Sequence, residues 1–425
     1  MNTLVQADYI ATIIPELAPA WIDHVLRYHG RAPPRAGRRP PFRYVDLGCG
    51  PGLGVAAYAA AYPEGEFVGV DASASHVEIG RRFAREVGLE NIRFIAGFFG
   101  DDDVLELGPV DYAVANGVYS WVGDAARDDL FKAIDRLLKP GGAAVVSANT
   151  VVGWLTLMPM QKLFAELTTA TPGRSTQEIV ANFKGVAAAL DAAARNDLIK
   201  DGASRYGEMA EKFPHGYVAH EFLVDAWRPI WTLELMRRFA DVGCDYLGGG
   251  RLSAMRDDFA FGKAQRDLLA TAPSVGAALT LRDMFLRQGH FHGVAARPGP
   301  GAISGAPPSR LDGWARLDRE PGDVEYHAET DAGRLKFDNA VARRIVAALA
   351  GGARPLREIA AAADASGEAA FHRVMDGLFA SEQALPVDPP TDDGGLCARF
   401  ADLAAERGYV GGPAPDPHGT PRRPI

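Results

Sequence analysis

A glycine-rich stretch in the first quarter of the chain holds the residue pattern with the clearest chemistry. Residues 45–54 read Val-Asp-Leu-Gly-Cys-Gly-Pro-Gly-Leu-Gly, so that an apolar strand predicted over 42–47 runs into glycines at alternate positions. A helix is predicted directly afterwards, over 53–62. Glycine is required where a strand turns sharply into a helix while its backbone passes close to a ligand. The stretch therefore predicts a ligand-binding loop.

Two acidic residues narrow the choice of ligand. A dinucleotide-binding loop reads G-x-G-x-x-G, whereas this loop reads G-x-G-x-G-x-G and follows Asp46 in the strand end. Asp46 would repel a pyrophosphate but suits a ligand with a cationic amino-acid end. Asp71 ends the next predicted strand, about 20 residues later, where a carboxylate accepts hydrogen bonds from ribose hydroxyls. S-adenosylmethionine, which carries an ammonium, a sulfonium and a ribose, fits better than a dinucleotide; a glycine-rich turn without a ligand is the plainer alternative.

Predicted strands and helices alternate between residues 42 and 150. This alternation is typical of a Rossmann-like, doubly wound α/β domain, in which helices cover both faces of a parallel sheet. The carboxyl ends of its strands meet at one edge, where the ligand binds. The predicted strands are 42–47, 66–71, 92–95, 110–115 and 143–148, and the predicted helices are 53–62, 74–87 and 125–138.

The flanking regions have a different character. The expected division is an N-terminal helical segment (1–41), the α/β domain (42–154), a mainly helical domain (155–297), a linker (298–310), a C-terminal module (311–412) and a disordered tail (413–425). The basic residues of the loop 31–41 are expected to be solvated. The C-terminal module, with three predicted helices and a strand, resembles a small winged-helix unit. The tail is rich in proline and glycine, which disfavours a packed core.

Composition excludes several classes of function. The chain has 425 residues, 47% of them hydrophobic and 23% charged, with a net charge of −9, which argues against a general nucleic-acid binder. It contains no apolar run long enough to span a membrane and no signal-peptide pattern at its start. Its three cysteines are isolated, and the pair His290 and His292 has no acid or thiol nearby in the sequence, so no metal centre is expected. A cytoplasmic protein without membrane insertion is expected.

Further motifs make the chain similar to class I S-adenosylmethionine-dependent methyltransferases. Besides the glycine loop and Asp71, residues 138–142 read Leu-Lys-Pro-Gly-Gly. Residues 115–122, Ala-Asn-Gly-Val-Tyr-Ser-Trp-Val, resemble the A-H-G-V-Y-S-W-V signature of bacterial methyltransferases with an appended methyltransferase regulatory domain. Residues 147–154, Ser-Ala-Asn-Thr-Val-Val-Gly-Trp, resemble their S-Y-N-T-x-P-G-W run. The best-understood members are the rickettsial-type protein lysine methyltransferases that modify outer-membrane proteins.

The resemblance continues beyond the α/β domain. His-Glu-Phe-Leu at 220–223 and Trp-Arg-Pro at 227–229 are similar to the family's H-E-Y-L…W-x-P block, and the blocks at 245–248 and 282–285 follow in the family's order. The resemblance covers about residues 5 to 300. It implies S-adenosyl-L-methionine as cofactor. The residues that it assigns to the cofactor are Asp46, Gly48, Cys49, Gly50, Gly52, Asp71, Ala72, Phe98, Asn116 and Gly117.

Three positions depart from the family pattern on the acceptor side. Asn116 stands where the signature has histidine, and Ala148 and Val152 replace a tyrosine and a proline. After the third strand many methyltransferases place an acid that holds the adenine amino group; here either Asp101 supplies it or the contact is made by backbone alone. These departures leave the methyl acceptor more open than the cofactor.

The candidates for the acceptor side are Tyr119, Trp121, Asn149, Trp154 and His220. Methyl transfer is an in-line displacement, so the protein must align the acceptor, exclude water and, for an amine, favour its neutral form. The three aromatic residues are predicted to line the acceptor pocket, with ordinary packing as the alternative. Asn149 could orient the acceptor or form a turn. His220, with its neighbour Glu221, could be a general base or make a structural contact between domains.

The sequence thus predicts a methyltransferase whose acceptor is most simply a protein lysine. A small molecule or glycan precursor is the alternative acceptor, and a non-catalytic protein that binds S-adenosylmethionine is the alternative of another class. The helical domain is expected to cap the methyl-bearing edge of the sheet. The acidic balance of the chain would attract a basic acceptor, although salt screens that effect.

Overall fold

The computed structural model describes nine segments of the chain: residues 13–35, 39–213, 215–224, 226–286, 288–299, 308–330, 333–364, 367–389 and 394–407. The expected disordered tail at 413–425, most of the expected linker and the start of the N-terminal segment lie outside these residues. No helix in the described segments is long and apolar enough to cross a membrane.

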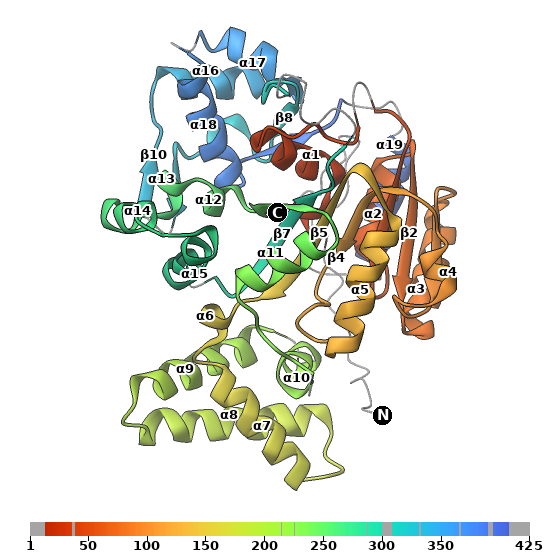
Figure 1. Ribbon diagram of the computed structural model, residues 1–425, viewed down its shortest axis with the longest axis vertical. Coiled ribbons are helices and arrows are strands. Elements are labelled where there is room, and N and C mark those ends of the chain that lie inside the picture. Colours follow the sequence, from red (N-terminus) through yellow and green to blue (C-terminus); the bar gives the residue numbers. More distant parts are fainter. Residues whose placement is uncertain are drawn as a thin grey trace.

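A seven-stranded sheet in the order β3-β2-β1-β4-β5-β7-β6 forms the centre of the molecule (Figure 1). Strands β1 to β5 are mutually parallel, whereas β7 runs antiparallel to both of its neighbours. The α/β prediction is therefore confirmed. The strand boundaries are close to those expected except in β5, which begins at Leu138 and not at the predicted residue 143. The strands are β1 Phe42–Leu47, β2 Gly65–Asp71, β3 Ile92–Ala96, β4 Val110–Ala115, β5 Leu138–Asn149, β6 Asp245–Gly249 and β7 His290–Ala296.

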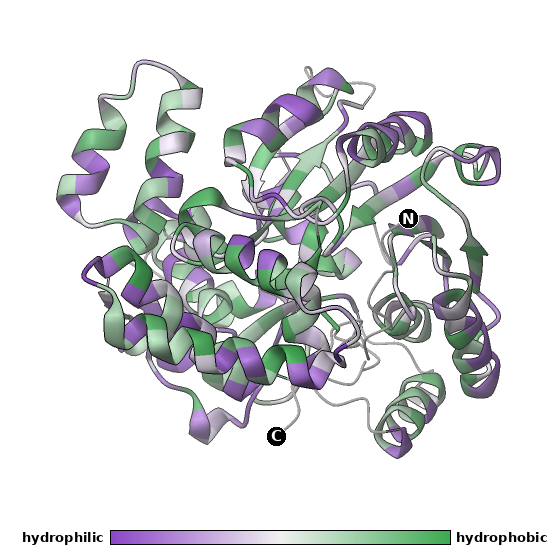
Figure 2. Ribbon diagram, turned by 90° about the horizontal axis from the view of Figure 1, so that it is seen from below, coloured by the Kyte–Doolittle hydropathy of each residue, from purple (hydrophilic) through white to green (hydrophobic). Residues whose placement is uncertain are grey.

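Helices cover both faces of this sheet, because its strands are apolar on both sides. One face packs against α1 Pro19–Tyr28, α2 Leu53–Ala61 and α3 Ala74–Val87. The other packs against α4 Asp102–Leu105, α5 Asp124–Leu137 and α11 Thr232–Asp241. Seen from below in Figure 2, hydrophobic and hydrophilic segments alternate along most helices, as expected for helices with one buried face. A short 3₁₀ helix, η1 Pro15–Leu17, precedes α1.

A helical layer follows β5 at the carboxyl end of the strands and lies at the lower end of Figure 1. It consists of α6 Val151–Trp154, α7 Met158–Ala170, α8 Thr176–Ala193, α9 Asp197–Lys212 and α10 His215–Leu223. Its own apolar core includes the stacked rings of Phe164 and Phe183, with centroids 4.1 Å apart. This layer, residues 151–223, covers only part of the range 155–297 over which a helical domain is expected.

The prediction of a mainly helical region over 155–297 is wrong at two strands. After α10 the chain returns to the sheet, where β6 and β7 add two strands at the β5 edge. Between them lie α12 Leu252–Met255, α13 Asp257–Ala260, α14 Lys263–Ala270 and α15 Val275–Leu286. The sequence did not predict β6, because it contains glycines at 248–250 and glycine is disfavoured in strand interiors. The segment His290–Ala296 is extended because it pairs with β5 as strand β7.

The C-terminal region contains small sheets and helices at the upper end of Figure 1, at the other end of the molecule from α7 to α9. The three predicted helices and the last strand are present, but the winged-helix assignment stays a prediction. The elements are β8 Trp314–Leu317, η2 Pro321–Asp323, β9 His327–Thr330, β10 Gly333–Lys336, α16 Ala340–Leu349, β11 Arg354–Pro355, α17 Leu356–Ala362, α18 Glu368–Ala380 and β12 Ala384–Val387.

The last described helix, α19 Gly394–Glu406, leaves this region and packs on the α/β domain. The Cys397 thiol lies 3.5 Å from the carbonyl oxygen of Ala60, and the Phe400 ring meets the Phe83 ring edge-on at 5.1 Å. The expected single module over 311–412 is therefore divided in its packing, since its final helix belongs with α2 and α3.

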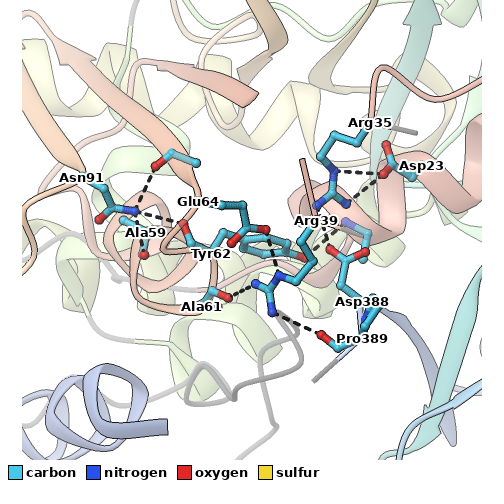
Figure 3. Close-up of polar contacts among 12 residues, drawn as sticks. Asp23, Arg35, Arg39, Ala59, Ala61, Tyr62, Glu64, Asn91, Asp388 and Pro389 are labelled. Carbon is cyan, nitrogen blue, oxygen red and sulfur yellow. Dashed lines mark hydrogen bonds and ion pairs between the residues drawn. The ribbon is translucent and has the colours of Figure 1, made fainter. Parts of the chain in front are cut away.

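The N-terminal loop is held by buried ion pairs rather than solvated as expected. Arg35, only 3% exposed, pairs with Asp23 at 2.8 Å and with Asp388 at 2.7 Å (Figure 3). It also donates to the Tyr112 hydroxyl at 3.0 Å. Arg39 pairs with Glu64 at 2.8 Å. The Arg35 contacts tie the N-terminal segment, the sheet and the C-terminal region together. A proline- and arginine-rich composition gives no sign of such partners, because they lie far away in the sequence.

Candidate active site

The glycine loop between β1 and α2 requires glycine for conformational reasons. Gly48, Gly50 and Gly52 have φ values of 91°, 56° and 77°, in the left-handed region that disfavours side chains. A Cβ atom at Gly52 would also collide with the Phe94 ring. The backbone N–H of Gly48 donates to the Val70 carbonyl at 2.8 Å, which fastens the loop to β2.

Asp71, at the end of β2, is bound to this loop. Its two carboxylate oxygens accept hydrogen bonds from the N–H groups of Gly50 and Ser73, both at 2.9 Å, and its Oδ1 lies 3.3 Å from Nδ1 of His76. Burial alone would raise the pKa of Asp71, but the hydrogen bonds from His76, Ser73 and Gly50 outweigh it and lower the pKa. Asp71 is therefore a fixed anion beside the loop.

Asp46 has the opposite environment. Its side chain is buried, and the burial, together with the nearby charge of Asp71, raises its pKa to about 7. A positive charge placed beside Asp46 would stabilise its ionised form. Cys49 is half-buried, and burial raises the pKa of its thiol, so it is an unreactive thiol that packs in the loop.

The residues after β2 and β3 extend the edge of the site. Ala72 is exposed next to Asp71. The Phe98 ring is 68% exposed, an unusual position for a large apolar side chain. Asp101 accepts a hydrogen bond from the Phe98 N–H at 2.8 Å, so it fixes this turn and does not reach out as a free acid.

The loop after β4 brings two further predicted cofactor residues to the same edge. Gly117, with φ 66°, donates its N–H to Ser147 at 2.8 Å. Oδ1 of Asn116 lies 3.1 Å from Nε2 of His292 on β7. Burial lowers the pKa of His292 to about 3, so the imidazole is neutral. An imidazole thus lies against the position where the family signature has its own histidine, which no local pattern could have revealed.

Tyr119 is buried in the core on the face of the sheet that α5 and α11 cover, and it does not line an open pocket. Its ring meets Phe131 edge-on at 5.8 Å, and its hydroxyl donates to Glu234 on α11 at 3.1 Å. Burial and the charge of Glu234 raise its pKa. This is the packing alternative that the sequence left open.

The turn after β5 holds Asn149 and Trp154. Asn149 is 1% exposed; its N–H donates to Ser120 and its carbonyl accepts from the N–H of Ile230, both at 2.8 Å. Its side-chain Nδ2 is buried and has no hydrogen-bond partner among the described residues. The Trp154 indole N–H donates to the Gly289 carbonyl at 2.8 Å. The turn is therefore rigid, while one buried amide within it is available for a ligand.

Aromatic rings surround this turn. Trp154 meets Trp227 at 5.1 Å and Phe222 at 6.1 Å between ring centroids. Trp121 packs against the same cluster, part-buried. The backbone N–H of Arg228 donates to the Ser120 carbonyl at 2.8 Å, which joins the helical layer to the loop after β4. The expectation that this layer meets the carboxyl edge near Tyr119 agrees with these contacts.

Glu221, beside Phe222 on α10, is an acidic residue that the sequence-based prediction named only as the neighbour of His220. It is 5% exposed, and burial raises its pKa to about 7. Its Oε2 has no hydrogen-bond partner among the described residues. His220 lies in the same helix, but its side chain is outside the described part of the structure. The sequence feature that could have indicated a buried acid is the position of Glu221 among apolar residues of the α10 segment.

The described residues contain no group of three or more His, Cys, Asp or Glu side chains that could hold a metal ion. His290 and His292 are close, with ring centroids 5.0 Å apart, but burial lowers the pKa of both to about 3 and no acid or thiol completes a site with them.

The arrangement fits S-adenosylmethionine. A fixed anion, Asp71, lies where ribose hydroxyls would donate, and the buried acid Asp46 requires a cation such as the ammonium. The exposed Phe98 ring offers an apolar surface for an adenine. The strained glycine turn between them lets the backbone approach the ligand closely.

Comparison with known proteins agrees with this geometry. The family model of a methyltransferase domain matches residues 45–142, and that of a predicted methyltransferase regulatory domain matches residues 214–291. The structure of PKMT2 from Rickettsia typhi in complex with AdoHcy has a similar fold, with a TM-score of 0.68 and 18% identity, over 90% of this chain and 78% of that one.

Two sequence relatives cover parts of the chain. An uncharacterised Synechocystis protein is 25% identical over 256 residues, 58% of this chain and 48% of its own, so the chain spans about half of that relative. A trans-aconitate 2-methyltransferase from Methylobacterium nodulans is 35% identical over 109 residues, 25% of this chain and 38% of its own. The family models thus identify residues 45–142 as a methyltransferase domain and residues 214–291 as a predicted methyltransferase regulatory domain, and the site geometry fits S-adenosylmethionine as the cofactor.

Proposed function

We propose that the chain transfers a methyl group from S-adenosylmethionine to the side-chain amine of a lysine in a protein. The observation that carries this proposal is the buried Glu221 carboxylate, whose Oε2 has no hydrogen-bond partner among the described residues and which precedes Phe222 of the aromatic cluster formed with Trp154 and Trp227. An aromatic enclosure suits an amine that must shed its proton, and a nearby carboxylate with a pKa of about 7 can take that proton. The sequence resemblance to rickettsial-type protein lysine methyltransferases supports the same acceptor.

When bound, S-adenosylmethionine supplies a methyl group on a sulfonium, which becomes a neutral thioether as the methyl leaves. Asp46 and Asp71 would hold the amino-acid and ribose ends. Asn149 Nδ2 would orient the incoming amine through water or the peptide carbonyl, and the aromatic rings would exclude bulk water from its path. Glu221 would accept the proton that the ammonium must lose before its nitrogen can attack.

The match to the trans-aconitate methyltransferase lies within a quarter of the chain, so it supports the cofactor more than an acceptor. We therefore do not propose a small-molecule acceptor, but the labelling experiment below would detect one. The winged-helix character of the C-terminal region and a cytoplasmic location belong to the same proposal.

Labelled methyl transfer tests the acceptor. Purified protein is incubated with methyl-labelled cofactor and a lysate of cells that lack the gene, and the product is separated by size and hydrolysed. We expect label in protein, recovered as methyllysine. Label confined to the low-molecular-weight fraction would replace the lysine acceptor by a small molecule, and a complete lack of transfer would contradict the enzyme.

The pH profile tests Glu221. We expect the wild-type rate at saturating acceptor to rise with pH through about 7, since the acid must be ionised to accept a proton. Glu221→Gln should lower the rate and remove that rise while S-adenosylhomocysteine binds as before. The control is Glu208→Gln, an exposed acid on α9. An unchanged profile in Glu221→Gln would exclude this role and remove the observation that carries the lysine proposal, which would then rest on the labelled-transfer result alone.

A further inference from the structure

A cavity of about 310 Å³ lies beside the outermost strand, β6, away from the glycine loop. Its walls come from α11, α12, α15 and the ends of β6 and β7. Most of them are apolar, including Met236, Met255, Leu279 and Leu286. Val275, 67% exposed, lies at its rim. Nothing in the proposed methyl transfer uses this space.

Two polar groups distinguish the cavity from a packing defect. His29, the C-cap residue of α1, has a buried Nε2 without a hydrogen-bond partner among the described residues. Burial lowers its pKa to about 4, so the ring is neutral at physiological pH. Asp283 on α15 is 8% exposed, and burial raises its pKa. A buried acid and an unpaired imidazole both gain from a ligand that donates hydrogen bonds.

The charges around the cavity favour a cationic ligand over an anionic one. Arg282 is a positively charged residue that lines the cavity. Its guanidinium pairs with Asp257 and donates a hydrogen bond to the Ala254 carbonyl at 2.7 Å. Its positive charge still lowers the pKa of Asp283, although less than the hydrogen bonds of Thr232 do. Asp283 itself forms no direct ion pair among the described residues, and its hydrogen bonds come from Thr232.

The cavity walls also hold the turn of the candidate active site. Thr232, fixed to Asp283 through its N–H at 2.8 Å and its hydroxyl at 2.6 Å, follows Ile230, which pairs with Asn149 and Val151. On the other side, Gln288 lines the cavity, and its carbonyl accepts a hydrogen bond from the hydroxyl of Thr150. The turn 149–154 is thus held between two walls of the cavity.

We propose that this cavity is a second ligand site, which takes a small, mainly apolar amine and whose occupancy stiffens the turn 149–154. An apolar cavity of about 150 Å³ holds benzene, so this one has room for roughly twice as many atoms, the size of an indole with a short side chain. The ammonium would lie between Asp283 and His29, and the ring among the leucine and methionine side chains. The site exists independently of the methyl acceptor.

Tryptamine is a suitable probe, and indole-3-acetate is its anionic counterpart of similar shape. Calorimetry is done on the full chain saturated with S-adenosylhomocysteine. We expect tryptamine to bind at least about tenfold more tightly than indole-3-acetate, a difference of about 1.4 kcal/mol. Failure of tryptamine to bind, or equal binding of the anion, would overturn the proposal.

Matched variants locate the probe. Leu279→Trp fills the cavity and should weaken tryptamine binding at least about tenfold. Met284→Trp puts the same side chain at a 53% exposed position of the same helix and should leave binding unchanged. If Leu279→Trp fails to fold, His29→Phe, which keeps the ring but removes the acceptor, should weaken binding severalfold. Wild-type affinity in the variant that folds would place tryptamine elsewhere and refute the site.

Hydrogen exchange tests the link to the active site. Tryptamine should slow amide exchange in peptides covering 149–157 of the wild type and of Met284→Trp, and leave Leu279→Trp unaffected. Unchanged exchange in the wild type despite tight binding would refute the link. Because this readout needs no methyl acceptor, it is independent of whether lysine is methylated.

Discussion

Asp46→Asn should stabilise the protein without ligand while weakening its affinity for the cofactor product. Asp46 is buried, has no ion-pair partner among the described residues, and has a pKa raised from 3.8 to about 7 by burial and by Asp71. Between these pH values the folded protein keeps a proton that the unfolded chain has lost, so the free energy of unfolding falls as pH rises. The full penalty, present above about pH 7, is at most about 4 kcal/mol.

Asparagine cannot ionise, so the variant should escape this penalty. Urea unfolding of the ligand-free protein at about pH 8 should show a gain of about 2–4 kcal/mol over the wild type. This gain should shrink to near zero at about pH 3, where the wild-type carboxyl is protonated in the folded state and largely protonated in the unfolded state. Asp111→Asn is the contrasting control: Asp111 is buried but pairs with Lys139 and accepts from the Arg43 N–H, so its loss should destabilise by about 1–3 kcal/mol.

Binding should change in the opposite direction. Calorimetry with S-adenosylhomocysteine should show wild-type affinity rising about tenfold between about pH 6 and 8, since Asp46 must ionise to pair with the ammonium. Asp46→Asn should bind more weakly and lose this dependence. A variant that is no more stable than the wild type at high pH, or that keeps the pH-dependent affinity, would refute the position of Asp46 as the unpaired acid that meets the cofactor.

Three further substitutions test the scaffold. Gly52→Ala should destabilise by more than about 1 kcal/mol because of its left-handed φ and its contact with a phenyl ring, whereas Gly123→Ala, at a position with open space, should be nearly neutral in thermal unfolding. Arg35→Met should lower the free energy of unfolding by about 3–5 kcal/mol in urea, because it leaves the buried Asp23 and the part-buried Asp388 without their partner. Arg31→Met, which removes a more exposed ion pair with Asp245, should lower it by less than about 1 kcal/mol. Tyr119→Phe should lose only about 1 kcal/mol of stability and keep methyl transfer; a large loss of activity with normal cofactor affinity would restore Tyr119 to the acceptor site.

The sequence determined the cofactor half of this protein. The alternation of strands and helices, the glycine spacing and the acids Asp46 and Asp71 are short-range features, and each has one economical structural explanation. The strand-to-helix turn forces the glycines into left-handed conformations, and the parallel sheet brings the end of β2 to the same edge. The spacing of residues close together in the sequence was therefore sufficient to predict the cofactor and the sheet edge at which it binds.

Tertiary structure decided the features made by residues far apart in the chain. Strands β6 and β7 are extended because β5 offers them an edge, which short glycine-containing segments do not reveal alone. His292 meets Asn116 across 176 residues. The Tyr119 ring packs against the buried Phe131, and its hydroxyl reaches the part-exposed Glu234 on α11. The raised pKa of Glu221 likewise comes from burial by the helical layer, and burial is a property of the fold, not of the acid's neighbours in the sequence.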